Sequence, residues 1–183
     1  EGGNAVITSR NLEEAKAVAT EVRKRYGGNS FALQADLTHH DEVKKMFRRI
    51  LDNYGTVDIL INNAGYPMVD ELWNKSLSKV SDEEFRRVME VDVMGSIRCV
   101  REAIPIMVQQ NRGVIINISS TPAIAGYDKG APYTVAKAGL IGLTKHIAYE
   151  YGVHNIRANT IALGNIKTPR TYDRLTAEKR LSM

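Results

Sequence analysis

Apolar residues along the chain form two alternating patterns, short continuous runs and longer stretches with helical spacing. The short runs are rich in β-branched residues, which is typical of buried strands. They occupy residues 5–8, 30–35, 57–61, 114–118 and 156–162. In the longer stretches apolar residues recur every three or four positions, which predicts helices with one buried face. These helices are expected at residues 12–26, 43–54, 82–110 and 132–151, and Pro105 is expected to kink the third of them.

Residues at the ends of the elements support this assignment. Asn11 with Glu14, and Ser81 with Glu84, have the spacing of a capping box, in which two side chains satisfy the free amides at the start of a helix. The segment 66–80 has no periodic pattern and is predicted to be a surface loop. The chain is therefore expected to alternate strictly between strand and helix, apart from this segment.

The alternation of strand and helix predicts the fold class. Strands in this order pair in parallel through right-handed crossovers, and helices cover both faces of the sheet. The fully apolar runs at 57–61 and 114–118 agree with strands buried on both faces. We therefore predict an α/β protein with a Rossmann-type doubly wound parallel sheet, in one domain over residues 1–183. Ligands of such sheets bind beyond the carboxyl ends of the strands.

Composition and charge argue against several classes of function. The chain has 25 Lys and Arg against 21 Asp and Glu, spread over several helices. Nucleic acids and membrane surfaces need concentrated basic patches, so neither is expected as a partner. No apolar run approaches the ~18 residues that span a bilayer, and the single Cys99 fits a reducing, cytoplasmic location. His39 and His40 have no partners at ligand spacing, so no metal site is expected.

Three residues between positions 113 and 152 form a candidate catalytic group. Tyr133 and Lys137 stand four apart on a predicted helix, so their side chains lie on one face. An ammonium beside a phenol favours the phenolate, which adapts the tyrosine to acid and base chemistry near neutral pH. Ser120, at the end of the preceding strand, would add a hydroxyl to the same pocket. The alternative is an exposed Tyr–Lys pair and a serine in a turn.

Taken together, the motifs at the strand ends resemble those of the classical short-chain dehydrogenase/reductase family. The Tyr-x-x-x-Lys motif stands at 133–137, and the serine of the family falls on Ser120. Asn-Asn-Ala-Gly stands at 62–65, the family aspartate at Asp36, and the family motif Pro-Gly-x-Ile-x-Thr appears at 163–168 as Leu-Gly-Asn-Ile-Lys-Thr. Tyr-x-x-x-Lys alone is a weak pattern, but these motifs in order along the chain are specific. The most similar members are 3-oxoacyl-carrier-protein reductases and glucose or alcohol dehydrogenases.

The resemblance implies an oxidoreductase that transfers a hydride between NADP(H) and a small-molecule carbonyl or secondary alcohol. In such an enzyme Tyr133 exchanges a proton with the substrate oxygen, and Ser120 hydrogen-bonds that oxygen. Lys137 tunes the tyrosine and holds the nicotinamide ribose. The family also implies a homodimer or homotetramer, built on the helices at 82–110 and 132–151.

The resemblance also assigns residues to the cofactor. Members that use NAD have an acidic residue after the first strand visible here, whereas this chain has Ser9 and Arg10, which suit the 2′-phosphate of NADP. We therefore expect NADP, with NAD less favoured. The alternatives are that Arg10 is a solvated charge and that the asparagine-glycine turn is an ordinary strand end. The remaining expected contacts are Asp36, Leu37, Asn63, Ala64, Gly65, Tyr133, Lys137, Gly164, Ile166 and Thr168.

The chain departs from the family pattern in three places. The glycine-rich phosphate loop is absent, and residues 171–183 resemble only the start of a substrate lid. Residues 1–183 on their own are expected to be neither stable nor active, because loss of a central strand leaves unpaired sheet edges. Asp92 replaces the asparagine that completes the catalytic set, and an ionised carboxylate cannot donate a hydrogen bond. Leu163 replaces a proline, with a minor effect expected.

Two other interpretations stay open from the sequence. Asp92 favours a catalytically impaired dinucleotide-binding protein with a regulatory role, and the two incomplete ends favour a non-functional fragment.

Trp73 and Tyr66, which follow Gly65, are candidates for the wall of a substrate cleft, with surface packing as the alternative.

Overall fold

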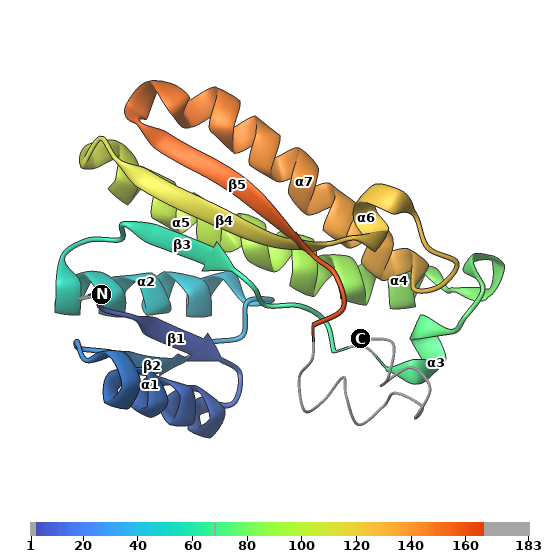
Figure 1. Cartoon of the computed structure of the whole chain (residues 1–183), viewed down its shortest axis with the longest axis horizontal. Helices are drawn as coiled ribbons and strands as arrows, with labels where there is room; N and C mark the ends of the chain where they lie inside the picture. Colours follow the sequence, from blue (N-terminus) through green and yellow to red (C-terminus); the bar gives the residue numbers. More distant parts are fainter. Residues whose placement is uncertain (1–2, 68, 167–183) are drawn as a thin grey trace.

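The computed structural model describes residues 3–67 and 69–166, in which strands and helices alternate (Figure 1). The strands are β1 (Val6–Ser9), β2 (Phe31–Gln34), β3 (Ile59–Asn62), β4 (Gly113–Ser120) and β5 (Ile156–Leu163). The longer helices are α1 (Leu12–Tyr26), α2 (His40–Tyr54), α4 (Asp82–Met89), α5 (Gly95–Gln109) and α7 (Ala131–Tyr151). The shorter ones are α3 (Asp70–Trp73), η1 (Leu77–Lys79), η2 (Glu90–Met94), α6 (Pro122–Ala125) and η3 (Gly152–His154).

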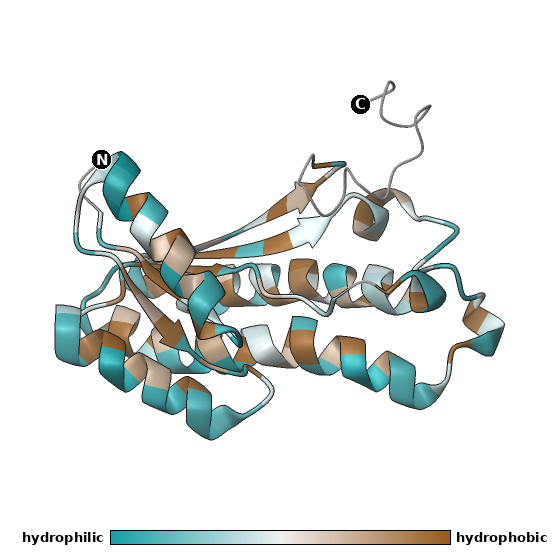
Figure 2. Cartoon of the chain, turned by 90° about the horizontal axis from the view of Figure 1, so that it is seen from below, coloured by the Kyte–Doolittle hydropathy of each residue, from teal (hydrophilic) through white to brown (hydrophobic). Residues whose placement is uncertain are grey.

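The strands form two parallel sheets, β1 with β2, and β3 with β4 and β5. Strand β4 is central in the larger sheet and pairs with β5 over its whole length. Helix α1 packs on one side of β1 and β2, while Leu33 and Ala35 belong to a core shared with α2, α5 and α7. Figure 2 shows apolar residues on the strands and polar residues on the outer sides of the helices. This arrangement confirms the predicted α/β fold with a parallel sheet and helices on both sides.

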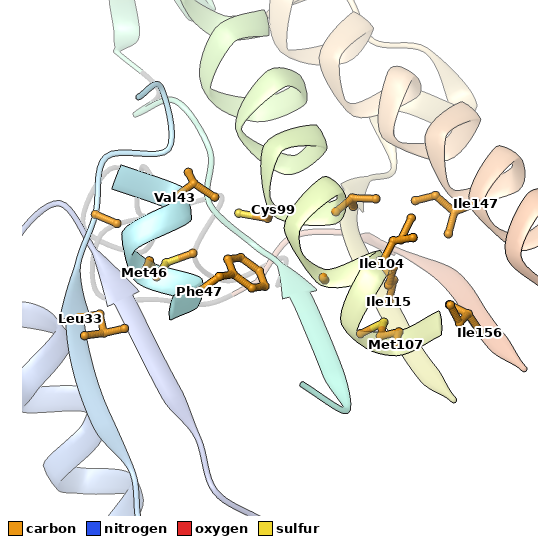
Figure 3. Packing of buried hydrophobic residues seen from close by; sticks show 13 residues of the cluster. Leu33, Val43, Met46, Phe47, Cys99, Ile104, Met107, Ile115, Ile147 and Ile156 are labelled. Atoms are coloured by element: carbon orange, nitrogen blue, oxygen red, sulfur yellow. The ribbon is translucent and has the colours of Figure 1, made fainter. Parts of the chain in front are cut away.

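One hydrophobic cluster extends across both sheets (Figure 3). Met46 and Phe47 of α2 meet Cys99 of α5 in this cluster, and Met107 of α5 and Ile115 of β4 are fully buried toward the larger sheet. Burial of such side chains stabilises each by roughly 1.5–3 kcal/mol. Among the described residues, the two sheets are thus joined by side-chain packing through α2 and α5 and not by strand pairing.

Strands β1 and β3 each have one edge that pairs with no described strand. On β3, Ile59 and Ile61 are 59% and 57% exposed, so part of the larger sheet has an uncovered apolar face. Free edges and exposed apolar faces favour association with further polypeptide. The low stability and activity expected of residues 1–183 alone stay a prediction, as does the single domain.

Two expectations about local structure need correction. The segment 66–80 contains the helical turns α3 and η1 and is not a plain loop. The helix expected over 82–110 is divided by the π-helical turn η2 into α4 and α5, and α5, which contains Pro105, ends at Gln109. Apolar periodicity identifies a buried face, but it does not reveal one extra residue in a single turn.

The two capping boxes differ in the structure. At the start of α4, Ser81 and Glu84 form the complete reciprocal box. At the start of α1, Asn11 Oδ1 accepts from the Glu14 amide, but the Asn11 amide donates to Ser9 Oγ at 3.1 Å. The expected box at Asn11 is therefore replaced by a cap that uses the preceding serine.

A chain of buried hydrogen bonds crosses the larger sheet at one level. Asn62, Asn117 and Thr160 occupy matched positions on β3, β4 and β5. Asn62 Nδ2 donates to Asn117 Oδ1 at 2.8 Å, and Asn117 Nδ2 donates to Thr144 Oγ1 of α7 at 2.8 Å. Thr160 Oγ1 donates to the same Thr144 oxygen at 2.7 Å. A shift of one residue would leave these groups unpaired, so the chain of bonds specifies strand register and the position of α7.

We expect Asn117→Ala to lower the free energy of unfolding of the intact protein by about 2–4 kcal/mol, because it leaves the buried Asn62 amide without its acceptor and removes one of the hydrogen bonds of Thr144. Urea unfolding followed by far-UV circular dichroism measures the change. The control is Asn53→Ala, which removes an exposed amide that donates to Arg49 O on α2 and should cost less than about 1 kcal/mol. Equal losses in the two variants would contradict a role for the buried chain.

Candidate active site

Helix α7 carries Tyr133 and Lys137 at the carboxyl end of β4. The helix begins after Gly130, whose φ of 64° is left-handed, and has Pro132 in its first turn. Lys137 is 5% exposed, and its Nζ lies 5.6 Å from the centre of the Tyr133 ring. The Nζ donates a hydrogen bond to Ile118 O at 3.1 Å. The burial of Lys137 is inconsistent with the alternative of an exposed helix pair.

Asp92, in η2, is the second charged group of the site and is fully buried. Its Oδ1 accepts a hydrogen bond from the Tyr66 amide, and its Oδ2 lies 3.3 Å from Lys137 Nζ. Oδ2 makes no hydrogen bond of good angular geometry, but charge attraction depends mainly on distance, so the two groups form an ion pair. Each charge offsets part of the loss of hydration that the other suffers on burial.

The π-helical turn places Asp92 against the end of β3. In this turn the Gly95 amide bonds Glu90 O, five residues back, which widens the helix locally. Gly65 lies so close that a Cβ added there would be 3.2 Å from Asp92 Oδ2. Ser96 Oγ donates to Asp92 O at 2.7 Å and so holds the turn from within the helix. Glycine at position 65 therefore leaves room for the carboxylate, and a side chain there would press against Asp92.

Ser120 ends β4 and is paired with Leu163, the last residue of β5. Its Oγ donates to Leu163 O at a long 3.3 Å, and the Thr121 amide donates to the same carbonyl at 2.9 Å. The neighbouring Ser119 Oγ donates to Lys137 O at 2.8 Å and thereby attaches β4 to α7. The structure thus brings together Asp92, Lys137 and Tyr133. Ser120 ends β4, the strand that is hydrogen-bonded to Lys137 through Ile118 O and Ser119 Oγ.

On the cofactor side, Ser9 ends β1 and Arg10 follows it, near Asp36, which comes after β2. The Ser9 hydroxyl oxygen accepts a hydrogen bond from the Asn11 amide, whereas the Arg10 side chain is exposed. Partial burial would raise the pKa of the Asp36 carboxyl, but two hydrogen bonds from Thr38, together with nearby Arg10 and His39, outweigh burial and hold this pKa below its usual range. Asp36 is therefore ionised at neutral pH.

The other predicted cofactor residues lie at the same edge. Asn63, Ala64 and Gly65 are exposed after β3, as are Gly164 and Ile166 after β5. Thr168 lies outside the described residues.

Leu37 packs against α5 next to these strand ends. A Cβ at Gly95 would lie 3.1 Å from Leu37 Cβ, and Arg98 Nη1 donates to Leu37 O at 3.0 Å. The loop that carries Asp36 and Leu37 is therefore attached to the helix that follows Asp92.

Sequence reasoning missed groups that act through the backbone or through distant packing. The Tyr66 amide and the Ser96 hydroxyl hold Asp92, and Gly130 gives space to the Trp73 ring. A signal existed for Ser96, which stands four residues after Asp92 in a helix. The contact of Trp73 with Gly130 carries no local signal, because the two residues are far apart in the chain.

Other chemistry is limited in the part of the chain that the structure describes. No group of three His, Cys, Asp or Glu side chains there is placed to bind a metal ion. Burial raises the pKa of the Cys99 thiol to about 12, so Cys99 stays protonated in the core and is unreactive. Within residues 3–67 and 69–166, no helix has the length and apolar character needed to cross a membrane.

Comparisons with known proteins agree with this geometry. The family model for short chain dehydrogenase matches residues 1–179. The 3-oxoacyl-[acyl-carrier-protein] reductase FabG of Staphylococcus aureus is 36% identical over 184 residues, which cover 100% of this chain and 72% of that protein. The structure of a gluconate 5-dehydrogenase from Burkholderia cenocepacia with NADP and tartrate has a TM-score of 0.80 and 27% identity, and the match covers 89% of this chain and 62% of that one. ElxO with NADP bound has a TM-score of 0.83 and 29% identity, over 92% of this chain and 66% of that one.

A parallel α/β fold with a buried Lys–Asp pair beside a tyrosine at the strand ends defines an oxidoreductase of the dinucleotide-binding class. The chain belongs to the short-chain dehydrogenase family, since the family model covers nearly its whole length. It spans roughly two thirds of the proteins that it matches, from 62% to 72% of their length.

Proposed function

We propose that the intact protein is an NADP-dependent oxidoreductase that interconverts a small-molecule carbonyl compound and its secondary alcohol. The observation that carries the proposal is the burial of Lys137, 5.6 Å from the Tyr133 ring and 3.3 Å from Asp92, where β3, β4 and β5 end. Burying a lysine is costly without a partner. A charge kept in this position therefore supports a chemical role for the neighbouring phenol.

Each side chain has a role that follows from its position. The Tyr133 phenol gives a proton to the substrate oxygen during reduction and takes it back during oxidation. The Ser120 hydroxyl donates a second hydrogen bond to that oxygen by giving up its long bond to Leu163 O. Lys137 stabilises negative charge on the phenol, and Asp92 holds the ammonium in place. NADP(H), when bound, supplies or accepts the hydride.

The residues at the strand ends fit an NADP molecule. Arg10 presents an exposed guanidinium that can bind a phosphate in bidentate fashion. Ionised Asp36 can accept a hydrogen bond from an adenine amino group, and the exposed backbone at Ala64 and Gly65 allows close approach of a ribose. The two neighbouring structures with NADP, a gluconate 5-dehydrogenase and ElxO, support NADP as the cofactor.

We expect Arg10→Ala to raise KM for NADPH by about tenfold to a hundredfold and to change KM for NADH by less than about threefold, because only NADPH carries the 2′-phosphate. Steady-state kinetics with each cofactor on the intact protein measure both values. The control is Arg25→Ala, which removes another exposed guanidinium at the end of α1. A parallel rise in both KM values for Arg10→Ala would contradict recognition of the phosphate.

A panel of ketones and 3-oxo esters tests the activity itself. The intact protein, incubated with NADPH and each compound, should oxidise NADPH in proportion to the alcohol formed, as measured by absorbance and product analysis. Binding of NADPH without turnover of any compound would instead favour the catalytically impaired regulatory protein, for which Asp92 is the supporting feature.

Sedimentation of the intact protein tests the proposed homodimer or homotetramer, and cell fractionation tests the proposed cytoplasmic location.

A further inference from the structure

Trp73, the only tryptophan of the chain, is the middle one of three aromatic rings beside the proposed acid/base residue. Its ring centre lies 5.7 Å from that of Tyr133, with the planes at 73°, and 5.7 Å from that of Tyr127, with the planes at 33°. Both distances fall within the range of attractive aromatic pairs. The three rings form a continuous aromatic surface that begins at Tyr133.

The indole ring is held by the loop before α7. Gly130 donates its amide to Trp73 O at 2.9 Å. A Cβ at position 130 would lie 2.2 Å from the indole Cζ3, so the ring lies directly on the glycine backbone. The adjacent Leu72 is buried in a second apolar cluster with Val88 and Ala136, which anchors α3 to α4 and α7.

Polar contacts hold the same segment on its other side. Lys75 Nζ donates to both carboxylate oxygens of Glu84 at 2.7 and 2.8 Å, and Lys129 Nζ donates to Asn74 Oδ1 at 2.8 Å. The hydrogen bond from Lys75, with those from Ser81, lowers the pKa of the Glu84 carboxyl to about 2, so this contact persists across the neutral range. Trp73 is therefore held in place at several points beside Tyr133.

Part of the aromatic surface is exposed and is not covered by other described residues. Tyr127 is 57% exposed although it contacts the indole ring, and Trp73 itself is half-buried. The open faces of these two rings leave apolar area in water, which a bound aromatic group would cover. An open aromatic surface that adjoins a reacting group points to a ligand.

We propose that Trp73 and Tyr127 form a subsite for an aromatic group carried by the substrate next to its reacting carbonyl. The inference rests on the proposed function, because it takes Tyr133 as the group that binds the substrate oxygen. A substrate oxygen hydrogen-bonds a phenol at about 2.7 Å, which brings substituents on the reacting carbon within reach of the neighbouring indole. A flat aromatic surface gains stacking area from an aryl group and less from a small alkyl group.

Kinetics on the intact protein test this substrate class. Ethyl 3-oxo-3-phenylpropanoate and ethyl 3-oxobutanoate share the reacting 3-oxo ester and differ in an aryl against a methyl group. We expect Trp73→Ala to lower kcat/KM for the aryl ester by about tenfold or more and for the methyl ester by less than about threefold. Trp73→Phe should keep most of the preference. Equal losses for both esters in Trp73→Ala would overturn the proposal and leave only a packing role.

Fluorescence of Trp73 gives a second measurement that does not depend on turnover. The difference in emission between the intact protein and Trp73→Phe reports on position 73. Benzamide, an aryl compound that the enzyme does not reduce, should quench this difference saturably, and acetamide at the same concentration should not. Tyr127→Ala should weaken the quenching, whereas Tyr26→Ala, which removes an exposed ring at the end of α1, should leave it unchanged.

The two measurements separate failure of the subsite from failure of the proposed function. If no ketone is reduced but benzamide still quenches position 73, the aromatic subsite stands and the proposed reaction fails. If ketones are reduced but benzamide does not quench and the aryl preference is absent, the reaction stands and the subsite is wrong. Circular dichroism of Trp73→Ala shows whether loss of fold contributes, and Trp73→Phe provides the comparison in which the fold is kept.

Discussion

Tyr133→Phe is expected to lower kcat of the intact protein by about 10³-fold while leaving the affinity for NADPH within about threefold. The substitution removes one oxygen atom, which is the proposed proton donor and acceptor. The phenyl ring keeps its edge contact with Trp73 and its place beside Lys137, so packing at the start of α7 is unchanged. Loss of activity would therefore report on proton transfer and not on folding.

Steady-state assays with NADPH and the best ketone of the panel measure kcat, and titration of NADPH fluorescence measures binding. Tyr149→Phe is the matched control, because Tyr149 is on the same helix but is 92% exposed. This control should keep full activity. If Tyr133→Phe retained more than about a tenth of the activity, the phenol could not be the main acid/base group.

Lys137→Met is expected to abolish activity and also to destabilise the fold. The ammonium is 3.3 Å from the buried Asp92 carboxylate, so its removal leaves a buried charge without a counter-charge. Breaking such a pair typically costs about 3 kcal/mol or more. Activity should fall by at least about 10²-fold, because the site loses the positive charge beside the phenol that is proposed to transfer the proton.

A second substitution separates the two effects. Asp92→Asn combined with Lys137→Met removes both charges, and the asparagine can still accept the Tyr66 amide through its Oδ1. We expect the double variant to recover most of the lost free energy of unfolding but none of the activity. Urea unfolding and NADPH oxidation measure the two quantities. A double variant that is no more stable than Lys137→Met would show that the ion pair is not the source of the loss.

Lys75→Met is the control for an ion pair that is only partly buried. Lys75 and Glu84 are bonded at 2.7 Å but are 33% and 29% exposed, so water replaces much of what the pair contributes. The expected loss is below about 1 kcal/mol. The contrast between Lys75→Met and Lys137→Met tests burial, and not ion pairing as such, as the cause of the destabilisation.

The site residues that could be predicted interact with residues close to them in the sequence, whereas those that were missed interact with residues far away in the sequence. Tyr133 and Lys137 could be placed on one face from their spacing, because helix geometry alone aligns residues four apart. The partners of Lys137 could not be deduced in this way. They are Asp92 and Ile118 O, which only packing of α7 against η2 and β4 brings to the ammonium.

Asp92 illustrates the same limit from another side. Sequence comparison indicated a replaced asparagine and left the role of the carboxylate open, including impaired catalysis. In the structure the carboxylate is compensated by Lys137 and by the Tyr66 amide, inside a π-helical turn that periodicity did not reveal. Compensation of the charge favours a working site over an impaired one, and the assays above test that preference.

The amino-acid sequence by itself determined the α/β alternation, the carboxyl-end location of the candidate residues and the shared face of Tyr133 and Lys137. These features depend on local periodicity and on rules of strand connection, both of which act over short stretches of chain. Only the tertiary structure decided that Asp92 neutralises Lys137, that Trp73 lies against Tyr133 and Gly130, and that the described strands form two separate sheets. Such contacts join distant segments, and their energies depend on burial, which no local pattern records.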